Sequence, residues 1–148
     1  MSIISDRAFA SERSTTNRIN HFIIPGVPVP LYRPRMSGGH CWDSQKQQKM
    51  VISLMLTTQL ADGPLFAGPL FIDFMFYFPL PKRMTNKKKK EVIGTPHTFK
   101  PDIDNVLKFY LDCASNDILF HDDAIVVRIA AQKLYGEPRT EMIITELS

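Results

Sequence analysis

Two groups of acidic residues have the types and spacing needed to bind a metal ion. The segment PDIDNVLK places Asp102, Asp104 and Lys108 in the pattern D-x-D-x-x-x-K, and the segment HDD places Asp122 and Asp123 directly before an apolar run. Hard cations such as Mg²⁺ take oxygen ligands and are commonly bound by a few carboxylates, water and substrate phosphates. A metal at such a site can activate water and neutralise charge on a phosphodiester, and the ammonium group of Lys108 can add charge stabilisation.

The local sequence also suggests how the first acidic group could be presented. Pro101 disfavours helix at the residue before it, so we expect an extended chain up to this point and a helix soon after. If Asp102 is still extended while Asp104 begins the helix, both carboxylates can converge, with Lys108 one turn further on. The structural alternative is an ordinary helix cap and an ordinary helical ion pair, and the D-x-D-x-x-x-K motif alone favours it. The second acidic pair, Asp122 and Asp123, would not help to form a hydrophobic core, so its presence favours the metal site.

A basic segment precedes the acidic helix. Between residues 82 and 100 there are seven lysines or arginines against one acid, whereas the rest of the chain is slightly acidic. The segment contains Gly94 and Pro96 and no apolar stripe, which predicts a mobile loop. It could contact phosphates, although four adjacent lysines are often only a solvated surface. The candidate phosphate-binding residues, including two from a proline-rich loop nearer the N-terminus, are Arg33, Arg35, Lys82, Arg83, Lys87, Lys88, Lys89, Lys90 and Lys100.

The elements expected to position these residues are strands and helices of ordinary length. An α+β fold with a small mixed β-sheet and two main helices is the expected architecture. The apolar stripe over 102–114 predicts one helix, and the other begins at Asp43 or Ser44. Trp42 is expected in the core, and a strand over 70–78 is expected to be covered on both faces. Further strands are expected at 19–25, 118–121, from 123 onward, and 140–146.

Composition indicates one domain and excludes several classes of protein. The chain has 148 residues, of which 44% are hydrophobic and 22% charged, enough for a real core. Residues 1–19 read as a flexible leader, which leaves a single domain at 20–148. The two cysteines are far apart in the sequence and indicate neither zinc nor a disulfide framework. No apolar run is long enough to span a membrane, and the start lacks a signal-peptide pattern, so a cytoplasmic protein is expected.

Three segments together resemble a known family. KPDIDNVLKFYLD, FHDDAIVV and KLYGEPR are similar to the corresponding parts of the RusA-type Holliday-junction resolvases, which are small Mg²⁺-dependent endonucleases of phages and prophage regions. IPGVPVPLYRPRM and the basic segment also match, so the resemblance covers roughly residues 20 to 147. It implies that Asp102, Asp104 and Asp123 hold Mg²⁺, for which Mn²⁺ is expected to substitute, and that Lys108 stabilises charge. Asp122 is a further candidate of the second pair, and the neighbouring His121 could assist the site. Asp112, four residues after Lys108, is expected to position that lysine.

The resemblance implies a function as well as a site. It indicates a structure-selective endodeoxyribonuclease that resolves four-way DNA junctions by paired nicks, in DNA recombination and repair, inside a bacterium or a phage-infected cell. The family acts as a two-fold homodimer, which suits a substrate with two symmetric strands. Two alternatives stay open: a dimer that binds branched DNA without cutting it, and a metal-dependent nuclease for flaps or single strands. The complete acidic motif disfavours the first, because carboxylates facing phosphate would weaken a pure binder.

Overall fold

A four-stranded mixed sheet forms the centre of the protein, and the computed structural model describes it within residues 17–148. The strands are β1 (Arg18–Pro25), β4 (Leu70–Phe78), β5 (Val126–Tyr135) and β6 (Arg139–Glu146), in the order β1-β6-β4-β5. β4 and β5 are parallel, and the other neighbours are antiparallel. The α+β prediction is therefore confirmed. Of the predicted leader, residues 1–16 lie outside the described part, whereas its last two residues belong to β1.

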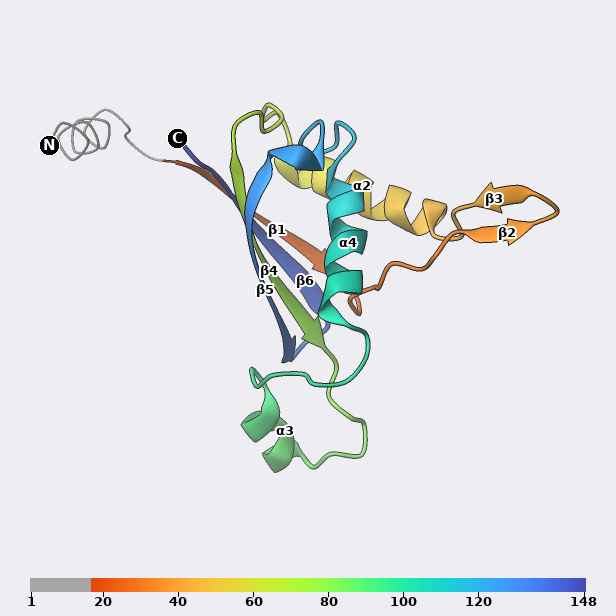
Figure 1. The fold of residues 1–148 in the computed structure, drawn as a ribbon. Helices are drawn as coiled ribbons and strands as arrows, with labels where there is room; N and C mark the ends of the chain where they lie inside the picture. Colours follow the sequence, from red (N-terminus) through yellow and green to blue (C-terminus); the bar gives the residue numbers. More distant parts are fainter. Residues whose placement is uncertain (1–16) are drawn as a thin grey trace, which may run out of the picture.

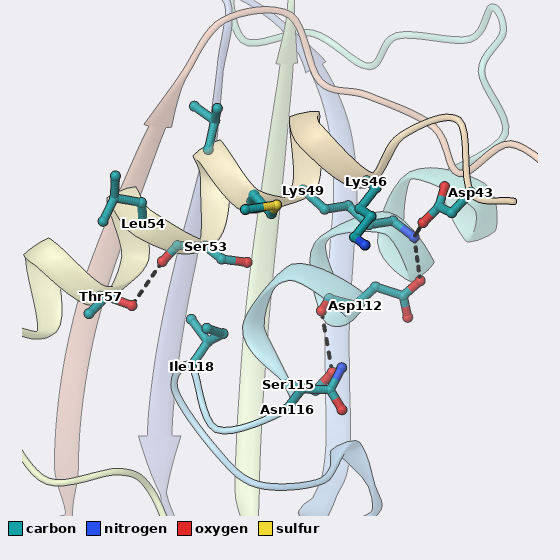
Figure 2. Close-up of a pocket in the computed structure, with 12 residues that line it drawn as sticks. Asp43, Lys46, Lys49, Ser53, Leu54, Thr57, Asp112, Ser115, Asn116 and Ile118 are labelled. Atoms are coloured by element: carbon teal, nitrogen blue, oxygen red, sulfur yellow. Dashed lines mark hydrogen bonds and ion pairs between the residues drawn. The ribbon is translucent and has the colours of Figure 1, made fainter.

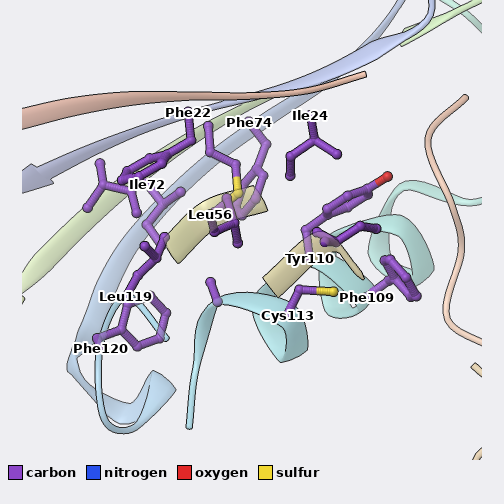
Figure 3. Packing of buried hydrophobic residues seen from close by; sticks show 14 of the residues in the cluster. Phe22, Ile24, Leu56, Ile72, Phe74, Phe109, Tyr110, Cys113, Leu119 and Phe120 are labelled. Carbon is purple, nitrogen blue, oxygen red and sulfur yellow. The ribbon is translucent and has the colours of Figure 1, made fainter. Parts of the chain in front are cut away.

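The two main helices, α2 (Lys46–Leu60) and α4 (Ile103–Ala114), lie on the same side of the sheet (Figure 1). α4 belongs to the crossover that the parallel pair β4 and β5 requires. Of its predicted apolar stripe, Val106, Tyr110 and Ala114 are buried, Leu107 and Leu111 are half-buried, and Ile103 is exposed. β4 buries every second residue from Leu70 to Phe78 beneath the helices. Figure 3 shows these aromatic and aliphatic side chains interdigitating between the helices and the sheet.

The opposite face of the sheet carries no helix, so the expectation that β4 is covered on both faces is wrong (Figure 1). The alternate residues of β4 are accordingly half-buried rather than buried. Asp73 is one of them, and it lies on a central strand of the sheet.

The basic segment is structured rather than a mobile loop. It contains a short helix, α3 (Asn86–Val92), with Thr85 as its N-cap. The Thr85 hydroxyl accepts a hydrogen bond from the Lys88 backbone N–H. After α3, backbone N–H groups of Gly94 and His97 donate to carbonyls of β5. α3 buries no residue, which is why the sequence of this segment shows no apolar stripe. The position of α3 therefore depends on the Thr85 cap and on these contacts with β5.

The proline-rich segment also contains structure that was not predicted. A two-stranded hairpin of β2 (Arg35–Ser37) and β3 (His40–Trp42) extends beyond the N-terminal end of α2 (Figure 1). Gly38 and Gly39 form its turn, and both have positive φ angles, which glycine adopts at little cost. Trp42 is exposed on this hairpin instead of lying in the core. Two smaller predictions also differ: α2 begins at Lys46, and residues 118–121 form a turn with one isolated bridge rather than a strand.

Candidate functional site

The first acidic group lies at the N-terminal end of α4. Asp102 is extended and occupies the N-cap position, and Asp104 is in the first turn, as the sequence predicted. The Asp102 side chain forms no hydrogen bond to the helix N–H groups. It accepts one from Lys100 Nζ at 2.7 Å, and this bond lowers the pKa of Asp102. Capping therefore does not explain the Asp102 carboxylate.

Lysines on both sides of the two carboxylates make this end of α4 suited to phosphate chemistry. Lys108 Nζ is 4.0 Å from Asp104 Oδ2, and Lys100 and Lys108 are both exposed. Lys133 of β5 donates hydrogen bonds to the carbonyls of Phe99 and Pro101, at 2.6 and 2.7 Å. Lys133 thus fixes the chain that leads into Asp102. The sequence pattern did not single it out, because the contact joins residues more than thirty positions apart.

The second acidic group lies at the start of β5, where Asp123 begins a short 3₁₀ turn, η1 (Asp123–Ile125). The Ala124 backbone N–H donates to Asp122 Oδ1 at 2.9 Å, and this bond lowers the pKa of Asp122. A hydrogen bond with Asp122, together with burial and the charges of Asp122 and Asp112, raises the pKa of Asp123. Crowded negative charge of this kind favours a bound cation.

Two of the supporting residues have other partners. His121 Nδ1 lies 2.8 Å from Asp117 Oδ1, and this contact raises the pKa of His121. Asp112 was expected to position Lys108, but its carboxylate contacts Lys49 Nζ of α2 at 3.4 Å. Asp112 therefore links the two helices, and Lys108 pairs with Asp104 instead.

The two acidic groups lie at opposite ends of α4 (Figure 1). The helix has 12 residues, which corresponds to a length of about 18 Å. Oxygen ligands of Mg²⁺ lie only about 2.1 Å from the ion. Within residues 17–148, no three histidine, cysteine, aspartate or glutamate side chains are close enough together to hold a metal ion. A single chain does not bring Asp102 and Asp104 together with Asp123.

The basic residues are distributed around the Asp102 end. α3 lies at the same end of the molecule as the N-terminus of α4 (Figure 1). All of its lysines except the half-buried Lys89 are exposed, as are Lys82, Arg83, Arg33 and Arg35. An open hollow of about 790 Å³ lies beside this end, between the proline-rich segment that includes Val27 and the chain at Lys100 and Pro101.

A second hollow, of about 680 Å³, lies between α2 and the C-terminal half of α4 (Figure 2). Its polar side is formed by Lys49, whose Nζ contacts Asp43 at 2.8 Å as well as Asp112. The remaining walls include exposed apolar side chains of α2, such as Leu54. This hollow contains none of the proposed catalytic carboxylates.

Carboxylates beside lysines at a helix N-terminus, with a lysine-rich helix next to them, are suited to chemistry on phosphodiesters. Comparison with known proteins agrees. A family model described as Endodeoxyribonuclease RusA matches residues 25–145. The chain belongs to this family, whose members are endodeoxyribonucleases that act on Holliday junctions, and the protein is thus a DNA hydrolase rather than a non-catalytic binder.

A bacterial relative extends the comparison. Over 138 residues the chain is 36% identical to the "Uncharacterized protein YqaN" of Bacillus subtilis (strain 168). The aligned region covers 86% of this chain and 96% of that protein. None of the helices in residues 17–148 has the length and apolar character needed to cross a membrane.

Proposed function

We propose that this protein resolves four-way DNA junctions by paired, Mg²⁺-dependent nicks, and that Mn²⁺ can replace Mg²⁺. The observation that supports this most directly is the exposed Asp102 carboxylate, which lies at the N-cap of α4 without capping it and pairs with Lys100 instead. Together with Asp104 it offers exposed oxygen donors of the type that Mg²⁺ prefers. When bound, the metal would activate water and neutralise charge on the scissile phosphate.

The residues of the chain have separate roles in this proposal. Asp102, Asp104 and Asp123 hold the metal, and Lys108 stabilises the charge that develops on the phosphate oxygens. Lys100 donates a hydrogen bond to Asp102, which orients that carboxylate and lowers its pKa. The exposed lysines of α3 and the arginines near the hairpin contact the phosphates of the junction arms.

A homodimer is part of the proposal, because one chain separates the ligands by the length of α4. Two copies packed antiparallel about a two-fold axis would bring Asp123 of one copy to Asp102 and Asp104 of the other. This arrangement creates two equivalent sites, as paired nicking of two symmetric strands requires. The exposed edge of β5, which ends near Lys133 and begins near Asp123, is compatible with such packing.

The central test is cleavage of a mobile four-way junction by Asp104→Asn, with wild type in Mg²⁺ and in EDTA as references. We expect the variant to bind the junction in a gel-shift assay and to lose nicking. Asp62→Asn, which changes an exposed loop aspartate outside both acidic groups, should nick like wild type. Undiminished nicking by Asp104→Asn would reject the metal site. Comparison with a flap and a single strand of the same sequence tests whether junctions are the preferred substrate.

A further inference from the structure

The β2–β3 hairpin exposes a set of side chains that folding does not explain. Met36 is 74% exposed and Trp42 41%, and every residue of both strands is exposed. Trp42 is the only tryptophan in the chain. Large exposed apolar side chains that gather on one projecting element indicate a surface that contacts something else.

Strand pairing places four of the hairpin side chains on one face. Arg35 lies directly opposite Trp42, and Ser37 lies directly opposite His40. Directly opposed residues share a face, as do residues two apart on a strand. The His40 and Trp42 rings lie in a stacked arrangement, with centroids 6.2 Å apart and planes 29° apart. The face therefore combines a guanidinium group with a short platform of aromatic rings.

The charge of the hairpin and of the segment that leads into it indicates what kind of partner the hairpin contacts. From Pro25 to Trp42 the sequence contains two arginines and one histidine and no acidic residue. A cationic platform of exposed rings suits a nucleobase joined to phosphate, because aromatic side chains stack on bases while arginine contacts the backbone. An acid-free, positively charged arm is well suited to a polyanion.

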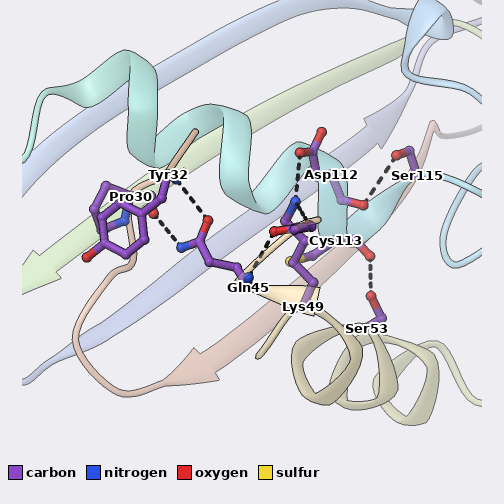
Figure 4. A network of polar contacts seen from close by, with 9 residues as sticks. Pro30, Tyr32, Gln45, Lys49, Ser53, Asp112, Cys113 and Ser115 are labelled. Atoms are coloured by element: carbon purple, nitrogen blue, oxygen red, sulfur yellow. Dashed lines mark hydrogen bonds and ion pairs between the residues drawn. The ribbon is translucent and has the colours of Figure 1, made fainter. Parts of the chain in front are cut away.

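The base of the hairpin is fixed firmly to the body. Gln45, only 4% exposed, donates from Nε2 to the Pro30 carbonyl and accepts at Oε1 from the Tyr32 N–H, both at 2.8 Å (Figure 4). It thus joins the chain that enters the hairpin to the chain that leaves it. The Leu31 N–H donates to the carbonyl of Asn105 at 2.9 Å, and Asn105 directly follows Asp104. The hairpin is mounted on the helix that carries the proposed metal ligands.

We propose that this hairpin recognises the branch point of DNA, with Trp42 and His40 stacking on a base that lacks a stacking neighbour and Arg35 contacting the adjacent phosphate. This inference rests on the proposed function, since it names the feature of the junction that the protein reads. A linear duplex offers no such base in its interior. The hairpin therefore favours branched over linear DNA, and the lysines of α3 bind both alike.

The single tryptophan allows a direct test on the unmodified chain. Intrinsic fluorescence is titrated with a four-way junction and with a linear duplex of the same sequence, both in EDTA so that neither is cut. We expect strong quenching by the junction and little by the duplex. Equal quenching by both would overturn branch-point stacking. No quenching by a junction that a gel shift shows to be bound would overturn it as well.

Variants supply the second measurement. Trp42→Ala should weaken junction binding about tenfold and leave duplex binding unchanged, whereas Trp42→Phe should retain most of the affinity. Met50→Ala, which changes an exposed apolar residue of α2 away from the hairpin, is the matched control. If Trp42→Ala binds the junction like wild type while wild type cleaves it, this inference fails and the proposed function stands. If wild type neither binds nor cleaves a junction, both fail.

Discussion

Subunit complementation tests how the proposed metal site is assembled. Asp104→Asn and Asp123→Asn should each abolish cleavage when every chain carries the change. If each site takes Asp104 from one copy and Asp123 from the other, a mixed dimer has one site with both changes and one intact site. Random pairing makes about half of the dimers mixed, so the mixture should regain about a quarter of the wild-type sites.

The distance between the two acidic groups makes recovery of cleavage by the mixed dimer the expected result. A helix of 12 residues spans about 18 Å, while two oxygens on one Mg²⁺ lie only about 3 Å apart. No rotamer of an aspartate covers that difference, so a single chain folded as described does not form the site by itself. Asp102 and Asp104 both belong to the N-terminal end, and a mixture of Asp102→Asn with Asp104→Asn should therefore recover nothing.

The assay is best performed on mixed dimers purified through two different affinity tags, with a supercoiled plasmid that extrudes a cruciform. Wild type should cut both strands across the junction and give linear DNA. The mixed dimer of Asp104→Asn and Asp123→Asn has one working site and should give nicked circles. Complete inactivity of that purified dimer, with both parent variants folded, would refute the shared site and require Asp123 to act outside it.

Four further predictions concern charge, reactivity and stability. Lys108→Gln should lower the cleavage rate about a hundredfold while junction binding in a gel shift changes little, because the ammonium acts on developing charge; a proportional loss of binding would contradict this. Changing Lys87 and Lys88 to glutamine should reduce the slope of log affinity against log salt by about 2, measured alike on junction and duplex, and an unchanged slope would remove α3 from the interface. Burial raises the pKa of Cys113 from 9.0 to about 12, so the native chain should expose only the thiol of Cys41 to a thiol reagent, with two reacting after denaturation. Because the unfolded thiol ionises first, the free energy of unfolding should decrease as pH rises above about 9, and a flat profile there would contradict burial.

Regular hydrophobic periodicity made the central elements predictable. α4 and β4 are recognisable because each buries one face against the same core, at steps of three and four or of two. α3 buries nothing, so its four lysines carry no periodic signal, and its position comes from contacts with β5. The hairpin strands have three residues each, too short for an alternating pattern to be read.

The candidate site was predictable in its residues but not in its assembly. The spacing of Asp102 and Asp104 before an apolar helix indicated an extended N-cap followed by a first turn, which is what the chain forms. The sequence does not indicate that Asp123 lies at the other end of that helix. The distance between Asp123 and the Asp102–Asp104 pair depends on the direction of α4 relative to β5. Contacts such as Lys49 with Asp112 and Lys133 with Pro101 join distant segments and leave no local signature.

α4 connects the two parts of the proposed activity. The chain entering the hairpin is bonded to Asn105, and the chain leaving it is tied through Asp43 and Lys49 to Asp112, so both stems are fastened to this one helix. A 12-residue helix packed on the sheet bends little, so it holds the stem of the hairpin and Asp104 at a fixed spacing. If Trp42 and His40 stack on a branch-point base as proposed, this helix sets the distance from the stacked base to the cleaved phosphate, and the position of the nick relative to the branch point should be fixed rather than variable.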